Sequence, residues 1–300
     1  MSNNDTNINQ ENNMAENLDW DKRNFKDNNL KNLHNAMEYN AASDPALRVI
    51  TNSAGWGIGV ADDNVPGVSH IEKFGMNIDV DNTKETIWDG GGIYTYIETA
   101  ETLTVTSSSV NDTPAGTGAR TVEIQGLNSA GEVVVEIVNL GSSTIAEFKR
   151  VFRVKVLTSG ASGVNEGTIS VTSDDTSSVL AIIGVDGTGP TTAGRGQTFM
   201  AQYTIPTGKT GYITQWTVGC GKQNTDAVAT LMTRNSDAPG DGAWNARDII
   251  TVSATTYAKN YNIPIKVNAG DDIEVRAYSS VNNSLVSSTF CVILIDNPAP

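Results

Sequence analysis

The segment RTVEIQGLNSAGEVVVEIVNL (residues 120–140) contains two runs in which apolar and polar side chains alternate. The first run is 120–128, the second is 132–140, and the turn residues between them include Gly131. An alternation with a period of two puts the apolar side chains on one face of a β-strand. A short connection that contains glycine is typical of a β-hairpin. The segment therefore predicts an antiparallel hairpin with one buried face.

Similar short runs, bounded by Gly, Pro, Asn and Asp, follow in both directions along the chain. They are 101–110, 148–159 and 167–173 in one half, and 198–206, 210–220, 226–234, 246–254, 261–267, 271–280 and 288–296 in the other. Strands at this spacing indicate a β-sandwich or jelly roll. We predict an all-β fold with one unit over 76–175 and a second over 198–297. We expect no long helix after residue 45.

Residues 1–45 differ in composition, because they are rich in asparagine and contain no glycine. Such a segment cannot form a core of its own. Apolar spacing over 16–39 predicts a short helix in this polar N-terminal arm, and a frayed tail is the alternative. We assign 1–60 to an anchoring arm and linker, and Gly and Pro residues over 46–75 predict a linker without helix. The predicted anchoring side chains are Leu18, Trp20, Phe25, Leu30, Leu33 and Met37.

The charge balance restricts the partners of this protein. The chain has 20 Lys and Arg against 34 Asp and Glu, a formal net charge of −14. Proteins bind nucleic acid mainly by neutralising phosphates with Lys and Arg, so neither nucleic acid nor an anionic membrane is an expected partner. No apolar run approaches the roughly 18–20 residues that span a bilayer. The first residues lack the basic and apolar regions of a secretory signal, so we expect a protein made in the cytoplasm without export by the usual route.

Catalytic chemistry is poorly supported by the sequence. The two histidines, His34 and His70, fall in the arm and the linker, and no serine has the sequence of a nucleophile elbow. Carboxylates are plentiful, but their spacing marks no pair for acid–base work. We therefore predict a protein that is not an enzyme and that needs no cofactor or metal.

Two weaker signals have alternative interpretations. The run 79–85 has oxygen ligands at alternate positions, but it lacks the central glycine and full register of an EF-hand, so a solvated turn is expected. Cys220 and Cys291 are expected to be free thiols in strands. A disulfide between them requires that their two strands are neighbours.

Five aromatic side chains near predicted loops could stack on sugars: Trp56, Trp88, Tyr94, Tyr96 and Trp244. Aromatic residues of β proteins more often pack in cores or subunit contacts. Trp244 lies in the polar loop 235–245, and loops commonly hold binding residues. It is the predicted ligand-binding residue, with a host glycan as the possible ligand.

The stretches IWDGGGIYTY (87–96) and TLTVTSSSVNDTPAGTGARTVEIQGLNSAGEVVVEIVNL (102–140) resemble a family of virion structural proteins of marine tailed bacteriophages. The later segments YTIPTGKTGYITQWTVGCGK (203–222) and IPIKVNAGDDIEVRAYSS (263–280) are similar to the same family, and the resemblance spans about 76–297. It implies a particle component without known catalysis, assembled in the host cytoplasm.

The expected role is a head-fibre, decoration or similar accessory protein. Its partners would be other virion proteins, such as the major capsid protein or a tail or portal component. By analogy with fibrous phage appendages, we expect a homotrimer. The alternative is a tail-associated adhesin that recognises host surface polysaccharide.

Overall fold

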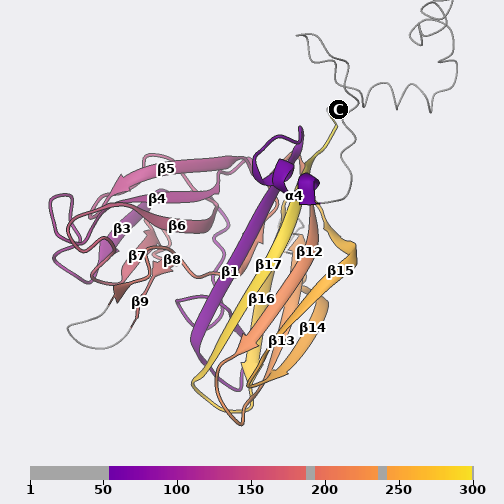
Figure 1. Cartoon of the computed structure of the whole chain (residues 1–300). Coiled ribbons are helices and arrows are strands. Elements are labelled where there is room, and N and C mark those ends of the chain that lie inside the picture. Colours follow the sequence, from indigo (N-terminus) through magenta and orange to yellow (C-terminus); the bar gives the residue numbers. More distant parts are fainter. Residues whose placement is uncertain (1–53, 187–192, 236–241, 299–300) are drawn as a thin grey trace, which may run out of the picture. The chain divides into compact units, whose positions relative to one another are not determined.

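The computed structural model describes residues 54–186, 193–235 and 242–298 (Figure 1). The chain divides into two compact units, Met1–Asp62 and Asp63–Pro300. The described part of the first unit is the helix α4, Ala54–Ala61. The prediction of a linker without helix over 46–75 is therefore wrong at this point. Glycine costs roughly 1 kcal/mol per helical position relative to alanine, which weakens a helix such as AGWGIGVA without forbidding it.

The second unit is built from antiparallel strands, and the prediction of an all-β fold is confirmed. The strands are β1 (Val68–Val80), β2 (Glu85–Thr86), β3 (Leu103–Ser107), β4 (Ala119–Leu127), β5 (Val133–Asn139), β6 (Arg150–Ser159), β7 (Ile169–Ser173), β8 (Val179–Ile183), β9 (Val185–Asp186), β10 (Ala193–Gly194), β11 (Gln202–Thr204), β12 (Lys209–Cys220), β13 (Asp226–Asn235), β14 (Asn245–Ser253), β15 (Thr256–Val267), β16 (Asp271–Ser279) and β17 (Ser284–Asp296).

One hydrophobic core lies between two sheets that are built mainly from the C-terminal half of the chain. The first sheet has the order β1-β17-β12-β15, and the second has the order β11-β16-β13-β14, with β2 paired to β16. Alternate residues of both sheets point into this core, with Trp216 and Phe290 as its largest fully buried side chains. The arrangement is a β-sandwich.

A second core lies between the sheets β3-β7-β8 and β5-β4-β6. Leu103 and Ile169 contribute to it from the first of these sheets, and Ile124 and Val138 from the second. The predicted hairpin is confirmed, because β4 and β5 pair in unbroken register from Thr121–Asn139 to Leu127–Val133.

Strand β1 is a correction to the predicted boundaries. It begins at Val68, inside the predicted linker, and pairs with β17 at the other end of the chain, from Val68–Ile295 to Val80–Ser284. The sequence does not reveal it, because the inward positions Lys73, Gly75 and Asn77 are not the apolar residues that an alternating pattern requires. Residues 94–183, which hold most of the second core, thus form an insertion between strands of the C-terminal sandwich.

The two cysteines lie in neighbouring strands but are not cross-linked. In the pairing of β12 with β17, Cys220 lies opposite Val286 and Cys291 lies opposite Gln215. Both thiols are free. This agrees with the expectation of free thiols in strands.

Candidate functional site

The outer face of the sheet β11-β16-β13-β14 bears a group of buried charges. In β16, Ile273, Val275 and Ala277 face the hydrophobic core, so the residues at alternate positions point the other way. Those outward residues are Asp272, Glu274 and Arg276. The neighbouring strands bring Thr204 and Arg234 beside Asp272, and Gln202 and Met232 beside Glu274.

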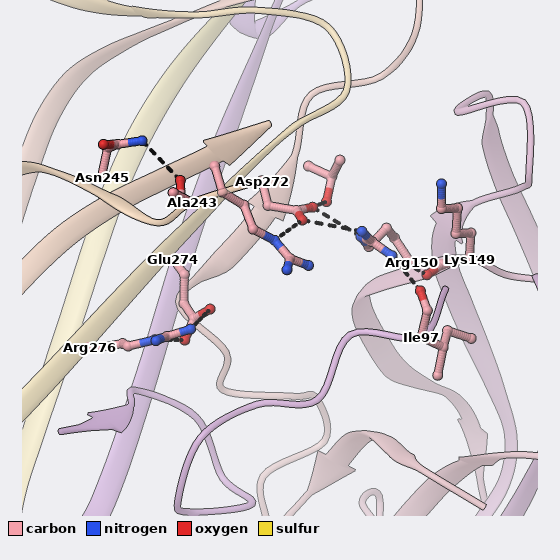
Figure 2. Close-up of polar contacts among 10 residues, drawn as sticks. Ile97, Lys149, Arg150, Ala243, Asn245, Asp272, Glu274 and Arg276 are labelled. Carbon is pink, nitrogen blue, oxygen red and sulfur yellow. Dashed lines mark hydrogen bonds and ion pairs between the residues drawn. The ribbon is translucent and has the colours of Figure 1, made fainter. Parts of the chain in front are cut away.

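Asp272 is a fully buried carboxylate with four hydrogen-bond donors around it (Figure 2). Arg150 donates from Nε at 3.0 Å and from Nη2 at 3.2 Å. Arg234 donates from Nε at 2.9 Å, and the Thr204 hydroxyl donates at 2.5 Å. Arg150 comes from β6 and also donates from Nη1 to the carbonyl of Ile97 at 2.9 Å. Asp272 therefore ties the inserted residues 94–183 to the C-terminal sandwich.

Glu274, two residues further along β16, makes the same kind of contact. Its carboxylate is fully buried and accepts hydrogen bonds from Arg276 Nε at 2.7 Å and Nη2 at 3.1 Å. The Thr86 hydroxyl of β2 donates to it at 2.5 Å. Charge-assisted bonds of this geometry are stronger than neutral ones, and bidentate pairing fixes the guanidinium plane. Figure 2 shows both carboxylates with their arginines.

Two aromatic rings alternate with the three guanidinium groups. Arg150 lies 5.0 Å from the centroid of the Tyr96 ring, and Arg234 lies 4.3 Å from it. Arg234 also lies 4.9 Å from the centroid of the Trp244 ring, and Arg276 lies 4.7 Å from it. All four distances are within the range of cation–π attraction. We call Arg150, Tyr96, Arg234, Trp244 and Arg276 the arginine–aromatic ladder.

The electrostatics keep this group in one charge state. Burial opposes the charge of Arg150, but Asp272 raises the pKa of Arg150 above its usual value. Burial likewise opposes the charge of Arg276, and Glu274 raises its pKa. Burial, followed by the charges of Glu274 and Asp272, raises the pKa of Tyr96 well above its usual value. Arg150 and Arg276 therefore stay charged and the Tyr96 phenol stays neutral, which is consistent with a structural role for the ladder.

The predicted sugar-stacking aromatics are partly brought together by the fold. Trp88 contacts Tyr94 edge to face at 5.0 Å, Tyr94 contacts Tyr96 at 4.8 Å, and Tyr96 contacts Trp244 at 5.7 Å between ring centroids. Trp56 belongs to α4, in the first unit of the chain. Trp244 is half-buried, and its ring contacts two guanidinium groups. Ligand binding by Trp244 stays a prediction, and its ring already has an internal structural role.

A buried lysine links β1 to β6 at a site that the sequence analysis missed. Phe152 is an extra residue in β6, because Arg153 pairs with Gln125 and Val151 pairs with Gly126. Its carbonyl, outside the strand ladder, accepts a hydrogen bond from Lys73 Nζ. Burial, and then the nearby Arg153, lower the pKa of Lys73 well below its usual value.

A cavity of about 240 Å³ adjoins this lysine. Lys73, Arg153 and Tyr203 line it, and so does His70, which was predicted to fall in the linker. His70 instead belongs to β1. The cavity thus lies beside a strand that the sequence pattern does not reveal.

A further ion pair lies on the segment that leads from β2 to the inserted residues. Arg195 pairs with Asp89, and its Nε lies 2.8 Å from Asp186 Oδ1. The same guanidinium lies 5.0 Å from the centroid of the Phe199 ring. Burial raises the pKa of Asp89 to about 6, although Arg195 opposes this shift.

Other predicted sites have simpler outcomes. The six predicted anchoring residues Leu18, Trp20, Phe25, Leu30, Leu33 and Met37 lie outside the described residues. Within the run 79–85, Glu85 accepts hydrogen bonds from Asn77 Nδ2 at 3.1 Å and from the backbone N–H of Asp81 at 3.0 Å. In the part of the chain that the structure describes, no three His, Cys, Asp or Glu side chains are placed to hold a metal ion. The described helix is too short to cross a membrane.

No protein-family model and no curated protein matches the chain. Among solved structures, infectious bursal disease virus Gx strain aligns with a TM-score of 0.22 and 12% identity over 80% of this chain and 75% of that chain. The infectious bursal disease virus VP2 subviral particle aligns with a TM-score of 0.21 and 11% identity, over 78% and 73%. These TM-scores are too low to establish a common fold, so the family resemblance stays a prediction.

Proposed function

We propose that this protein is a non-enzymatic structural component of a virus particle. Its role would be that of a head-fibre, decoration or similar accessory protein, with residues 1–60 as the anchor on another virion protein. The observation that supports this proposal most is the buried contact of Arg150 and Arg234 with Asp272, which ties the inserted residues to the C-terminal sandwich. Three arginines are used inside the molecule to hold its shape. Such internal use suits a component that must keep its form outside the cell.

The path of the chain is consistent with attachment through the arm. The β unit is entered at Val68, which pairs with Ile295 at one end of the sheet β1-β17-β12-β15. The opposite end of β1, at Val80, is twelve residues further along this strand, which is about 40 Å at 3.3 Å per residue. An anchor that precedes residue 62 would hold the β unit by the Val68 end of this sheet.

The experiment that tests the anchor is a deletion of residues 1–45, followed by incubation with purified particles that lack the protein. We expect a truncated form with an unchanged β-type circular dichroism spectrum that fails to bind. A full-length variant with Leu30, Leu33 and Met37 replaced by Ser is the matched control for the apolar side chains, and we expect it to bind weakly. Binding of the truncated form at full occupancy would place the anchor in the β unit. Incubation of the full-length protein with purified empty heads that lack tails distinguishes the two positions, because only a head component would bind them.

A second candidate function is a tail-associated adhesin for host polysaccharide, and the half-buried position of Trp244 between the exposed residues Ala243 and Asn245 favours testing it. A glycan array that shows binding by the wild type and loss of binding by Trp244→Phe, with an unchanged thermal midpoint, would support this role. An array without binding by the wild type would contradict it.

A further inference from the structure

The strand β5 has an exposed apolar face at the edge of its sheet. It is the outermost strand in the order β5-β4-β6 (Figure 1). Its residues Val133, Val135 and Ile137 are 53%, 55% and 59% exposed, and alternation puts them on the same face. β5 therefore presents three aliphatic side chains to solvent on one face, at a sheet edge.

The unused backbone groups of β5 belong to the same three residues. The Asn128 N–H donates to the Glu132 carbonyl at 3.0 Å, and the Leu140 N–H donates to the Arg120 carbonyl at 3.0 Å. Antiparallel strands alternate between hydrogen-bonded and non-hydrogen-bonded pairs. Counting from these two bonds, the odd-numbered residues 133, 135 and 137 form non-hydrogen-bonded pairs with β4. Their N–H and C=O groups point to the outer edge, where no further strand is paired in the described part of the chain.

Other edge strands of the molecule have features that discourage pairing. The pairing of β15 contains a bulge, and the strand also holds Lys259, Pro264 and Lys266. The pairing of β14 contains a bulge as well, and this strand holds Arg247 and Asp248. Bulges, prolines and charges are common means of preventing edge-to-edge contact.

Strand β5 has none of these features on its exposed face. Its pairing with β4 is unbroken, and it contains no proline, lysine or arginine. Its carboxylate, Glu136, accepts hydrogen bonds from the Ile145 and Ala146 N–H groups, each at 2.9 Å. An open edge of this kind is a template for an added strand.

We propose that β5 pairs with β5 of a second copy, antiparallel and centred on Val135. In this register Val135 faces its own copy, Val133 faces Ile137, and Val134 faces Glu136. Six aliphatic side chains then lie side by side, and no charge lies opposite a like charge, although the chain as a whole carries −14. The strand is thus self-complementary in both shape and charge, as a two-fold contact requires.

The contact is separate from the predicted trimer and does not rest on the particle role. A contact between two strands of about five to seven residues buries less accessible surface than the roughly 1,200–2,000 Å² of a stable interface. The pairing is therefore weak for free copies and becomes favourable when copies are held close together, because the effective concentration rises. A two-fold strand pair would join neighbouring copies or neighbouring oligomers.

Disulfide trapping in the full-length protein tests the contact and its register. In a Cys220→Ala and Cys291→Ala background, Val135→Cys would place the two thiols across the two-fold axis. The Cα atoms would be about 5.5 Å apart, inside the range that a disulfide spans. Val133→Cys would put its own copy about 14 Å away, at 3.4 Å per residue, which is too far. The double variant Val133→Cys with Ile137→Cys restores the match.

We expect a disulfide-linked dimer from Val135→Cys and from the double variant, and at least tenfold less from Val133→Cys. Ile249→Cys on β14, which is 59% exposed, is the matched control and should stay monomeric. Equal cross-linking of all variants would show random collision and overturn the proposal, and so would the absence of a dimer from Val135→Cys. We also expect the light scattering of the wild type to rise with protein concentration. Val135→Lys, which puts two lysines face to face, should abolish this rise and leave the circular dichroism spectrum unchanged.

Discussion

The substitution Asp272→Ala should destabilise the protein strongly, because it removes the shared acceptor of two buried arginines. The Asp272 carboxylate is fully buried and accepts hydrogen bonds from Arg150, Arg234 and Thr204. The side chains of Arg150 and Arg234 are only 8% and 9% exposed, so water does not readily replace the lost acceptor. The free energy of unfolding should therefore fall by a large amount.

The magnitude follows from the groups that remain. Each buried donor without an acceptor costs about 1–3 kcal/mol, and removal of one partner from a buried ion pair typically costs about 3–5 kcal/mol. We expect a loss of about 3–5 kcal/mol, with part of the larger sum recovered as the arginine side chains turn toward solvent. Urea unfolding followed by circular dichroism measures it.

The matched control is Asp248→Ala. Asp248 also pairs with a cation, Lys259 at 2.6 Å, but the lysine side chain is 41% exposed. Exposed pairs contribute about 0–1 kcal/mol, so this variant should lose little stability. A loss below about 1 kcal/mol for Asp272→Ala, or equal losses for the two variants, would refute the view that Asp272 holds the two parts of the β unit together.

Three further predictions concern packing and pH. Gly75→Ala should lower the free energy of unfolding by at least about 1–3 kcal/mol through overpacking, because a Cβ there would lie 2.2 Å from the Ile87 carbonyl oxygen. Gly221→Ala should be nearly neutral, since its Cβ would meet only the Leu285 side chain at 3.4 Å. Thermal unfolding of the two variants tests this difference. Asp89→Asn should become more stable relative to the wild type as the pH rises from about 4 to 6. The reason is that the Asp89 carboxyl of the folded wild type keeps its proton up to about pH 6, whereas in the unfolded chain it loses the proton near 3.8. Urea titrations of both proteins at several pH values measure this difference. Lys73 should show the opposite trend with pH. Its folded pKa lies below the unfolded 10.5, so the free energy of unfolding of the wild type should rise with pH between these two values. Lys73→Met should show a flatter dependence on alkaline pH in urea titrations.

The part of the fold that the sequence predicts is the part where apolar residues alternate in a strand. The hairpin of β4 and β5 and most strands after residue 200 follow this pattern. Strand β1 does not, because three of its inward residues are a lysine, a glycine and an asparagine. The two polar side chains have partners that only the tertiary structure reveals, the Phe152 carbonyl for Lys73 and the Glu85 carboxylate for Asn77, and Gly75 lies against the backbone of Ile87 and Ala201. Local periodicity cannot indicate a strand whose inward side chains bind polar groups.

The arginine–aromatic ladder was predictable only in part. Tyr96 and Trp244 were singled out as aromatics near loops, but nothing in their spacing indicates that they meet. Arg150 and Asp272 are 122 positions apart in the chain. One usable signal was present in β16, where Asp272, Glu274 and Arg276 alternate with Ile273, Val275 and Ala277. When such a strand has a charged face that lies against another part of the protein with its own hydrophobic core, ion pairs between these two parts are expected.

The pairing of β1 with β17 has a consequence for the order of folding during synthesis. Val68 and its partner Ile295 are separated by more than two hundred residues, so β1 cannot join its sheet until nearly the whole β unit has left the ribosome. The inserted residues 94–183 have most of their core partners within the same range, so they can fold before β1 is paired. Contacts between distant residues slow folding, and an unpaired strand is open to wrong partners meanwhile. We expect the last and slowest kinetic phase of refolding to be the closure of β17 between β1 and β12.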